Sequence, residues 1–153
     1  MRVAFAADHA GWPLRARVLH ELRDGGHVIV DCGSPEMVPG DDYPDLAAAV
    51  ARALVDGRAD RAILVCGSGV GACIAANKVP GIRACMCHDS FSARQGVEDD
   101  DMNVLCLGAR VIGEALAADL VRDFLGAHFS GLERHERRVG KVLAMEREGL
   151  IRG

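Results

Sequence analysis

The chain has 153 residues, which suits one domain, residues 1–153, built around one hydrophobic core. Half of the residues are hydrophobic but only 4% are aromatic, so small aliphatic side chains must fill that core. The formal net charge of −4 argues against a general role on nucleic acids or at membrane surfaces. Neither a membrane-spanning apolar run nor a signal-peptide pattern occurs, so a cytoplasmic protein is expected.

Short apolar runs alternate with longer segments of helical composition along the chain. Strands are expected at residues 3–7, 27–32, 62–66, 83–87 and 104–107. Helices are expected from Pro13 to the Gly25-Gly26 pair and at residues 45–56, 90–97 and 133–148. Residues 72–77 are expected to lie in a further helix, and residues 111–125 to hold another that begins near Gly113-Glu114. This alternation predicts an α/β fold with a single doubly wound, Rossmann-like sheet of five parallel strands and helices on both faces. The last helix is expected to extend to a partner subunit.

The most informative segment joins the third strand to the third helix. It reads Cys66-Gly67-Ser68-Gly69-Val70-Gly71, so three glycines at every second position end an apolar strand. Glycines permit a tight turn, and the first N–H groups of the following helix have no partner of their own, so the loop can hold an anion. Cys66 lies beside the helix start, where the helix dipole favours a thiolate, although it can also simply end a buried strand.

Further polar residues are expected at the same edge of the sheet. Right-handed crossovers place the carboxyl ends of parallel strands together, and ligands bind at that edge in open α/β sheets. Asp8 and His9 follow the first strand and His88 and Asp89 the fourth. We expect Asp8 and His9 to contact a ligand, the alternative being a helix cap and a surface histidine.

Two other features are candidates for ligand binding. Arg134 and Arg138 are four residues apart, so they share a helix face and suit a phosphate, with Arg110 after the fifth strand as a third member. The alternative is an exposed basic face. Tyr43, the only tyrosine, lies in the polar loop at residues 33–45 and is either a packing residue or a ligand contact.

Two other kinds of site are suggested by the sequence. Gly67, Gly69 and Ala72, followed by Asp89, match a dinucleotide fingerprint, but they lie on the third strand and five strands are one short of that fold. The acidic run at residues 98–101 is expected to be a solvated loop, with a divalent metal as the alternative.

The cysteines do not suggest a metal site or a disulfide framework. Cys32, Cys66, Cys73, Cys85, Cys87 and Cys106 contain no C-x-x-C pair and are expected to be thiols. Cys85-x-Cys87-His88 lacks a second ligand pair for zinc, so Cys85 and Cys87 are expected to be small buried residues.

A thiolate base, an oxyanion cradle and a phosphate clamp together indicate proton abstraction next to a carbonyl. Interconversion of an aldose and a ketose phosphate needs these three parts and requires neither a metal nor a redox cofactor. The alternative is a non-catalytic sensor that binds sugar phosphates or nucleotides.

The chain resembles ribose-5-phosphate isomerase type B, in the family that includes the galactose-6-phosphate isomerase subunits, through residues 7–11, 42–44, 66–71, 75–81, 88–89, 103–110 and 134–138. The resemblance implies a homodimer or a dimer of dimers with active sites shared between subunits, a small sugar phosphate as substrate, and no cofactor. It makes Cys66 the proton-transferring base, with Ser68 assisting proton movement between the substrate oxygens. The remaining implied contacts are the enediolate cradle (Gly67, Ser68, Gly69, Val70, Gly71), the substrate contacts (Asp8, His9, Tyr43) and the phosphate-binding arginines (Arg110, Arg134, Arg138).

The chain departs from this family at one place. Asp99 stands where the family has the histidine that opens the sugar ring, and Asp100 replaces an asparagine that contacts the substrate. A carboxylate can also exchange protons with a ring oxygen, so Asp99 remains a candidate catalytic residue. Because the change adds negative charge near an anionic substrate, we hypothesise a sugar phosphate with little need for ring opening, such as a four-carbon one, rather than ribose-5-phosphate.

Overall fold

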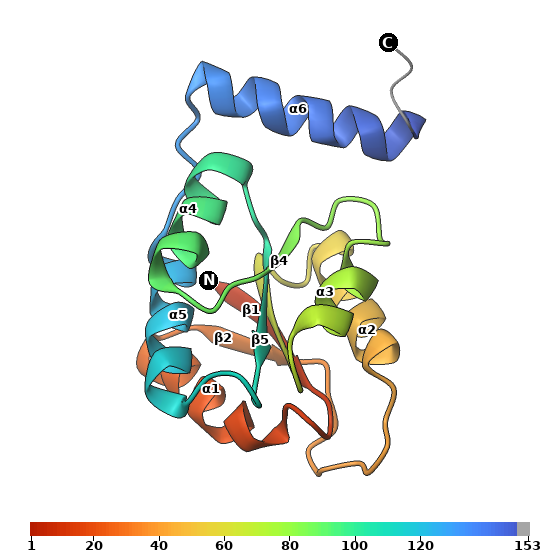
Figure 1. The fold of residues 1–153 in the computed structure, drawn as a ribbon, viewed down its shortest axis with the longest axis vertical. Coiled ribbons are helices and arrows are strands. Elements are labelled where there is room, and N and C mark those ends of the chain that lie inside the picture. Colours follow the sequence, from red (N-terminus) through yellow and green to blue (C-terminus); the bar gives the residue numbers. More distant parts are fainter. Residues whose placement is uncertain (150–153) are drawn as a thin grey trace.

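The structure, a computed structural model, describes residues 1–149 and is built on a five-stranded, all-parallel sheet (Figure 1). The strand order is β2-β1-β3-β5-β4. The strands are β1 (Arg2–Ala7), β2 (Val28–Asp31), β3 (Arg61–Cys66), β4 (Ala84–Met86) and β5 (Val104–Gly108). The predicted doubly wound α/β sheet is confirmed.

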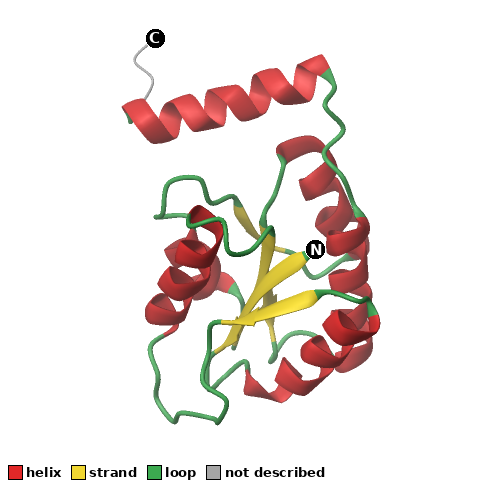
Figure 2. Cartoon of the chain, turned by 180° about the vertical axis from the view of Figure 1, so that it is seen from behind, coloured by secondary structure: helices red, strands yellow, loops and turns green. Residues whose placement is uncertain are grey.

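Helices cover both faces of the sheet, as Figures 1 and 2 show. One face carries α1 (Trp12–Asp24), α4 (Ser90–Asp100) and α5 (Glu114–Gly126), and the other carries α2 (Tyr43–Val55) and α3 (Val70–Ala76). The sixth helix, α6 (Glu133–Glu148), lies apart from the two layers and crosses above the end of α4 (Figure 1). Whether α6 contacts a partner stays a prediction.

The two faces of the sheet are packed differently. Side chains alternate along β1, so that Val3 and Phe5 face the α1, α4 and α5 layer while Ala4 and Ala6 face α2 and α3. Both sets are fully buried, as expected for a parallel sheet covered on both sides. The small residues beneath α2 and α3 let these helices approach closely, which brings the start of α3 against the end of β3.

Several predicted boundaries were wrong. The acidic run is not a loop, because α4 continues through Asp100 and ends at Asp101, whose φ of 51° is left-handed. Helix α2 begins at Tyr43 rather than at residue 45, since Pro44 suits the first turn of a helix. Strand β4 ends at Met86, one residue earlier than expected.

The six cysteines are all free thiols, as predicted. Cys87 is buried, but Cys85 is exposed, because β4 is the last strand of the sheet and has no neighbour on one side. In the described part of the chain, no helix is both long and apolar enough to cross a bilayer.

Candidate active site

The candidate active site lies where the strand order reverses direction, between β1 and β3. These strands are neighbours, yet their crossovers run to opposite sides of the sheet, so a crevice opens at their carboxyl ends. A cavity of about 330 Å³ is present there. Its lining residues are Asp8, His9, Ala10, Tyr43, Cys66, Gly67, Ser68, Arg110 and Val111.

Cys66 lies at the bottom of this cavity. It is the last residue of β3 and only 5% exposed, and the amide N–H of Gly69 donates a hydrogen bond to its sulfur at 3.0 Å. This contact requires the left-handed φ of 85° at Gly69, which favours glycine. The exposed Ser68 lies in the same loop, and its Oγ accepts a hydrogen bond from the Val70 N–H at 3.3 Å. The sequence therefore correctly placed a thiol and a hydroxyl beside a turn of backbone N–H groups.

Asp8 and His9 also line the cavity. Asp8 is buried, and its Oδ1 accepts a hydrogen bond from the Gly11 N–H at 2.7 Å, which closes the turn after β1. The Nδ1 of His9 lies 2.7 Å from Oδ1 of Asp41, and this hydrogen bond raises the pKa of His9. Asp41 gives no distinct signal in the sequence, where it is one of three aspartates in the polar loop at residues 33–45.

Tyr43 and Arg110 also line the cavity, and each packs against a glycine of the loop after β3. A Cβ at Gly71 would lie 2.8 Å from Cζ of Tyr43, so only glycine lets the tyrosine ring rest on the start of α3. A Cβ at Gly67 would lie 3.6 Å from the Arg110 guanidinium carbon, and the Arg110 N–H bonds the Gly67 carbonyl at 2.9 Å. Arg110 forms no ion pair among the described residues, so its charge is available to an anion.

Four other predicted site residues lie elsewhere. Asp99 and Asp100 occupy the last turn of α4, which leads into the beginning of β5, whereas Cys66 lies at the carboxyl ends of the strands. Arg134 and Arg138 are exposed on α6, beyond that far edge (Figure 1). Neither arginine makes an ion pair with residues 1–149. One chain therefore brings together Cys66, the glycine loop, Asp8, His9, Tyr43 and Arg110, but not these four.

His88 and Asp89 have structural contacts at the same edge as Cys66. The Gly108 N–H donates to Nε2 of His88 at 3.1 Å, and partial burial lowers the pKa of this histidine. Asp89 caps α4 by accepting the Ser92 N–H at 2.7 Å, which lowers the pKa of the carboxyl. In a dinucleotide site, the carboxylate of Asp89 would bind the ribose hydroxyl groups. Here its Oδ1 already accepts the Ser92 N–H.

No three His, Cys, Asp or Glu side chains within residues 1–149 converge in a way that could hold a metal ion. Asp99 and Asp100, in the acidic run, have different surroundings. Asp99 faces His135 of α6, while Asp100 lines a groove that is separate from the Cys66 cavity.

Comparison with known proteins agrees with this geometry. The family described as Ribose/Galactose Isomerase matches residues 3–142. Ribose-5-phosphate isomerase B of Escherichia coli is 42% identical over 147 residues, which cover 95% of this chain and 96% of that protein. D-erythrulose-4-phosphate isomerase of Pectobacterium atrosepticum is 40% identical over 131 residues, 86% of each chain. The structure of Clostridium thermocellum ribose-5-phosphate isomerase B is similar with a TM-score of 0.92 and 42% identity, over 97% of this chain and 99% of that one. The chain belongs to the ribose/galactose isomerase family.

Proposed function

We propose that residues 1–153 form one isomerase domain that interconverts the aldose and ketose forms of a small sugar phosphate, with Cys66 as the base. The observation that carries this proposal is the position of the Cys66 sulfur, in an open cavity beside a loop of backbone N–H groups and the Ser68 hydroxyl. A non-catalytic sensor of sugar phosphates would need the cavity and the arginines, but it would not need a thiol in the cavity.

The proposed reaction is a proton transfer through an enediolate. The Cys66 thiolate removes the proton from the carbon next to the carbonyl, and the Gly67–Gly71 loop stabilises the charge that develops on oxygen. Ser68 passes a proton between the two substrate oxygens, and the Cys66 thiol returns its proton to the neighbouring carbon. The proton taken from one carbon is returned to the neighbouring carbon, and the electron pair moves within the substrate. The reaction therefore balances without an external electron acceptor.

We further propose that the active site is shared between two copies of the chain. The Cys66 cavity contains one arginine, whereas two others and Asp100 lie at the opposite edge of the same chain. A twofold symmetric pair would bring Arg134 and Arg138 of each subunit to the cavity of the other, and both sites would be completed together. The exposed position of α6, outside the two helical layers, supports this arrangement.

The substrate that we favour is a four-carbon sugar phosphate. With Asp99 and Asp100 in the last turn of α4, a partner would bring carboxylates near an anionic substrate and would supply no imidazole at position 99. A tetrose phosphate that carries its phosphate on the terminal oxygen cannot close the usual ring. Two similar proteins are named for D-erythrulose-4-phosphate, so this substrate class occurs within the family.

A complementation experiment tests both the base and the sharing. Cys66→Ala should lower kcat by about 10²- to 10⁴-fold, the usual contribution of a general base, while retaining substrate binding. Arg138→Ala should weaken substrate binding. If both variants are mixed and allowed to exchange subunits, about one quarter of all sites should contain both native residues, because half of the dimers are mixed and each has one intact site.

Each control replaces the same residue type as the corresponding test variant. Cys32→Ala changes a thiol outside the cavity, and Arg137→Ala removes an arginine of α6 that pairs with Glu133 at 2.6 Å. Both should leave turnover unchanged. Full activity of Cys66→Ala would refute the catalytic proposal, whereas failure of the mixed sample to recover activity after proven subunit exchange would refute the shared site alone.

A further inference from the structure

Three residues connect α6 to the end of α4, and we call them the α4–α6 junction: Asp99, Ser130 and His135. The Nδ1 of His135 lies 2.6 Å from the Ser130 Oγ and 3.4 Å from Oδ1 of Asp99. His135 is only 3% exposed, although it belongs to a helix whose other residues are mostly exposed. A buried imidazole with two polar partners is costly to displace, so the junction fixes the first turn of α6.

The linker between α5 and α6 strengthens this attachment. The Ser130 N–H donates to the carbonyl of Glu98 at 2.9 Å, which ties the linker to the last turn of α4. The Ser130 Oγ also accepts the Leu132 N–H at 3.4 Å, just before α6 begins. The junction thus joins α4, the linker and α6 at one point.

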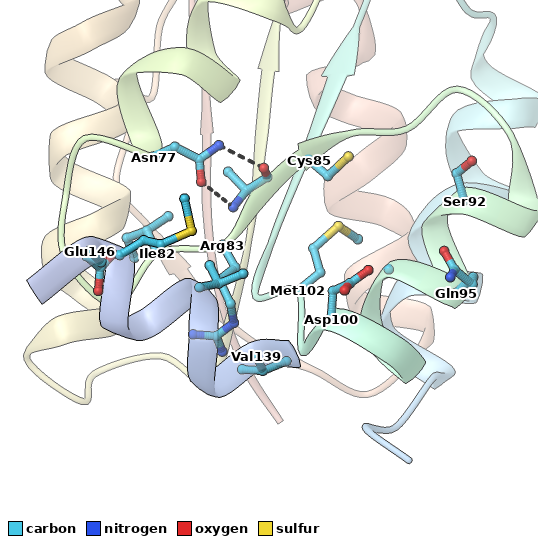
Figure 3. A pocket seen from close by; sticks show the side chains of 14 residues that line it. Asn77, Ile82, Arg83, Cys85, Ser92, Gln95, Asp100, Met102, Val139 and Glu146 are labelled. Atoms are coloured by element: carbon cyan, nitrogen blue, oxygen red, sulfur yellow. Dashed lines mark hydrogen bonds between the residues drawn. The ribbon is translucent and has the colours of Figure 1, made fainter. Parts of the chain in front are cut away.

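Asp99 uses both carboxylate oxygens inside its own chain. Oδ2 accepts a hydrogen bond from the Gln95 side chain at 2.7 Å, and Oδ1 faces His135. A group that opens a sugar ring needs an oxygen directed at the substrate. The neighbouring Asp100 is the one that is exposed, and it lines a groove of about 650 Å³ between α6 and the body of the protein (Figure 3).

Because α6 lies over this groove, the attachments at its two ends hold the helix in place, and the junction is the attachment near the two arginines. Between its two ends α6 passes over the groove, and its far end is held where Glu146 accepts the Gly81 N–H at 2.9 Å. Arg134 and Arg138 lie on either side of His135 in sequence, near the junction end. The junction therefore anchors the part of α6 that carries both arginines.

We propose that Asp99 is a positioning residue: through His135 and Ser130 it orients Arg134 and Arg138 for the substrate phosphate, and it does not open a sugar ring. This inference rests on the proposed function and refines it. The chain would then lack a ring-opening group at this position and would accept its substrate in the open-chain form.

Kinetic measurements on D-erythrulose-4-phosphate and ribose-5-phosphate separate the two roles of Asp99. Asp99→Ala and His135→Ala should each raise KM about tenfold for both substrates with little change in kcat, because phosphate binding is lost uniformly. The KM of the double variant should also rise about tenfold rather than a hundredfold, because both changes remove the same interaction. Asp99→Asn keeps an oxygen for His135 but cannot exchange protons, so it should stay within about threefold of the native enzyme.

The opposite pattern would overturn the proposal. If Asp99 opens the ring, Asp99→Asn should lose kcat on ribose-5-phosphate as severely as Asp99→Ala, while His135→Ala should leave kcat intact. Additive effects in the double variant would also refute a common junction. Glu98→Ala is the matched control, because Glu98 occupies the same turn but pairs with Arg94, and it should change nothing.

Two additional measurements keep the test decisive. The first is the binding of inorganic phosphate, measured by calorimetry: weaker binding by Asp99→Ala and His135→Ala would support the positioning role of the junction. This holds even if the native enzyme turns over no sugar phosphate, because absent turnover would count only against the proposed function. If His135→Ala fails to fold, Ser130→Ala removes the 2.6 Å contact without emptying the buried site, and it should raise KM in the same way. Unchanged phosphate binding in all these variants would refute the positioning role.

Discussion

Replacing Gly108 by alanine should disable the active site without touching a residue that performs chemistry. Gly108 ends β5 beside Cys66, and an added Cβ would lie 2.5 Å from the Ser68 carbonyl oxygen. Ordinary van der Waals contact begins near 3.4 Å, so the backbone at Ser68 would have to move by about 0.9 Å. The atoms that the added Cβ would meet belong to the backbone of Ser68 rather than to a flexible side chain, so the loop that carries Ser68 must shift as a whole.

The size of both effects follows from this displacement. A misplacement of about 1 Å in a catalytic constellation costs about 10²-fold in rate, so kcat/KM should fall by about that factor. Overpacking costs about 1–3 kcal/mol, which should lower the melting temperature by several degrees. Steady-state kinetics and thermal unfolding followed by circular dichroism measure the two quantities.

Gly126→Ala is the matched control for this substitution. Gly126 ends α5, and an added Cβ would meet nothing within 4 Å. Activity should be unchanged and stability should rise by up to about 1 kcal/mol, since alanine is the better helix former. A Gly108→Ala enzyme with native kcat/KM and native melting temperature would show that the loop does not pack against β5 as the structure indicates.

Two further predictions concern the cavity wall and the substrate. Asp41→Asn should lower the pKa of His9 towards its ordinary value of 6.5, measured by NMR titration of the imidazole ring, because the raised pKa of His9 comes mainly from the Asp41 hydrogen bond. Since that pKa is raised on folding, the stabilising contribution of the pair exists at low pH and disappears as the pH rises through the pKa of His9, so native protein and variant should differ in melting temperature only on the acid side. An unchanged His9 titration would contradict the assigned contact. For the substrate, kcat/KM should be higher for four-carbon than for five- or six-carbon aldose and ketose phosphates, and a clear preference for ribose-5-phosphate would refute the four-carbon proposal.

Much of the fold could be predicted because its sequence signals are local. The apolar runs of β1, β3 and β5 are short and uninterrupted, as expected for strands buried on both faces, and all three were found in nearly the correct place. The cavity followed from the same information, since residues that end neighbouring parallel strands must meet at one edge. The sequence therefore predicts a common site for Asp8 and Cys66, and both line the same cavity.

Other features depend on contacts between distant residues, which no local pattern reveals. The acidic run at residues 98–101 suggested a loop because its composition is polar, but α4 persists there because Asp99 bonds Gln95 one turn earlier and faces His135 of α6. Asp41 gave no signal, because its role depends on a fold that brings it 2.7 Å from a histidine 32 residues away. His135 lies between the predicted arginines Arg134 and Arg138, and nothing in the sequence indicates that it is the buried residue there.

The separation of the predicted site residues between two edges of the sheet follows from the topology itself. A crossover helix runs antiparallel to the strands that it connects, so the end of α4 and the end of β3 must lie at opposite edges of the sheet. At about 3.3 Å per residue, the five residues of β5 alone separate those edges by roughly 15 Å, longer than an extended four-carbon phosphate. No movement of loops in one chain can bring Asp100 to Cys66 across a packed strand. If both residues act on one substrate, two chains must supply them, and the exposed α6 is the element whose position allows it.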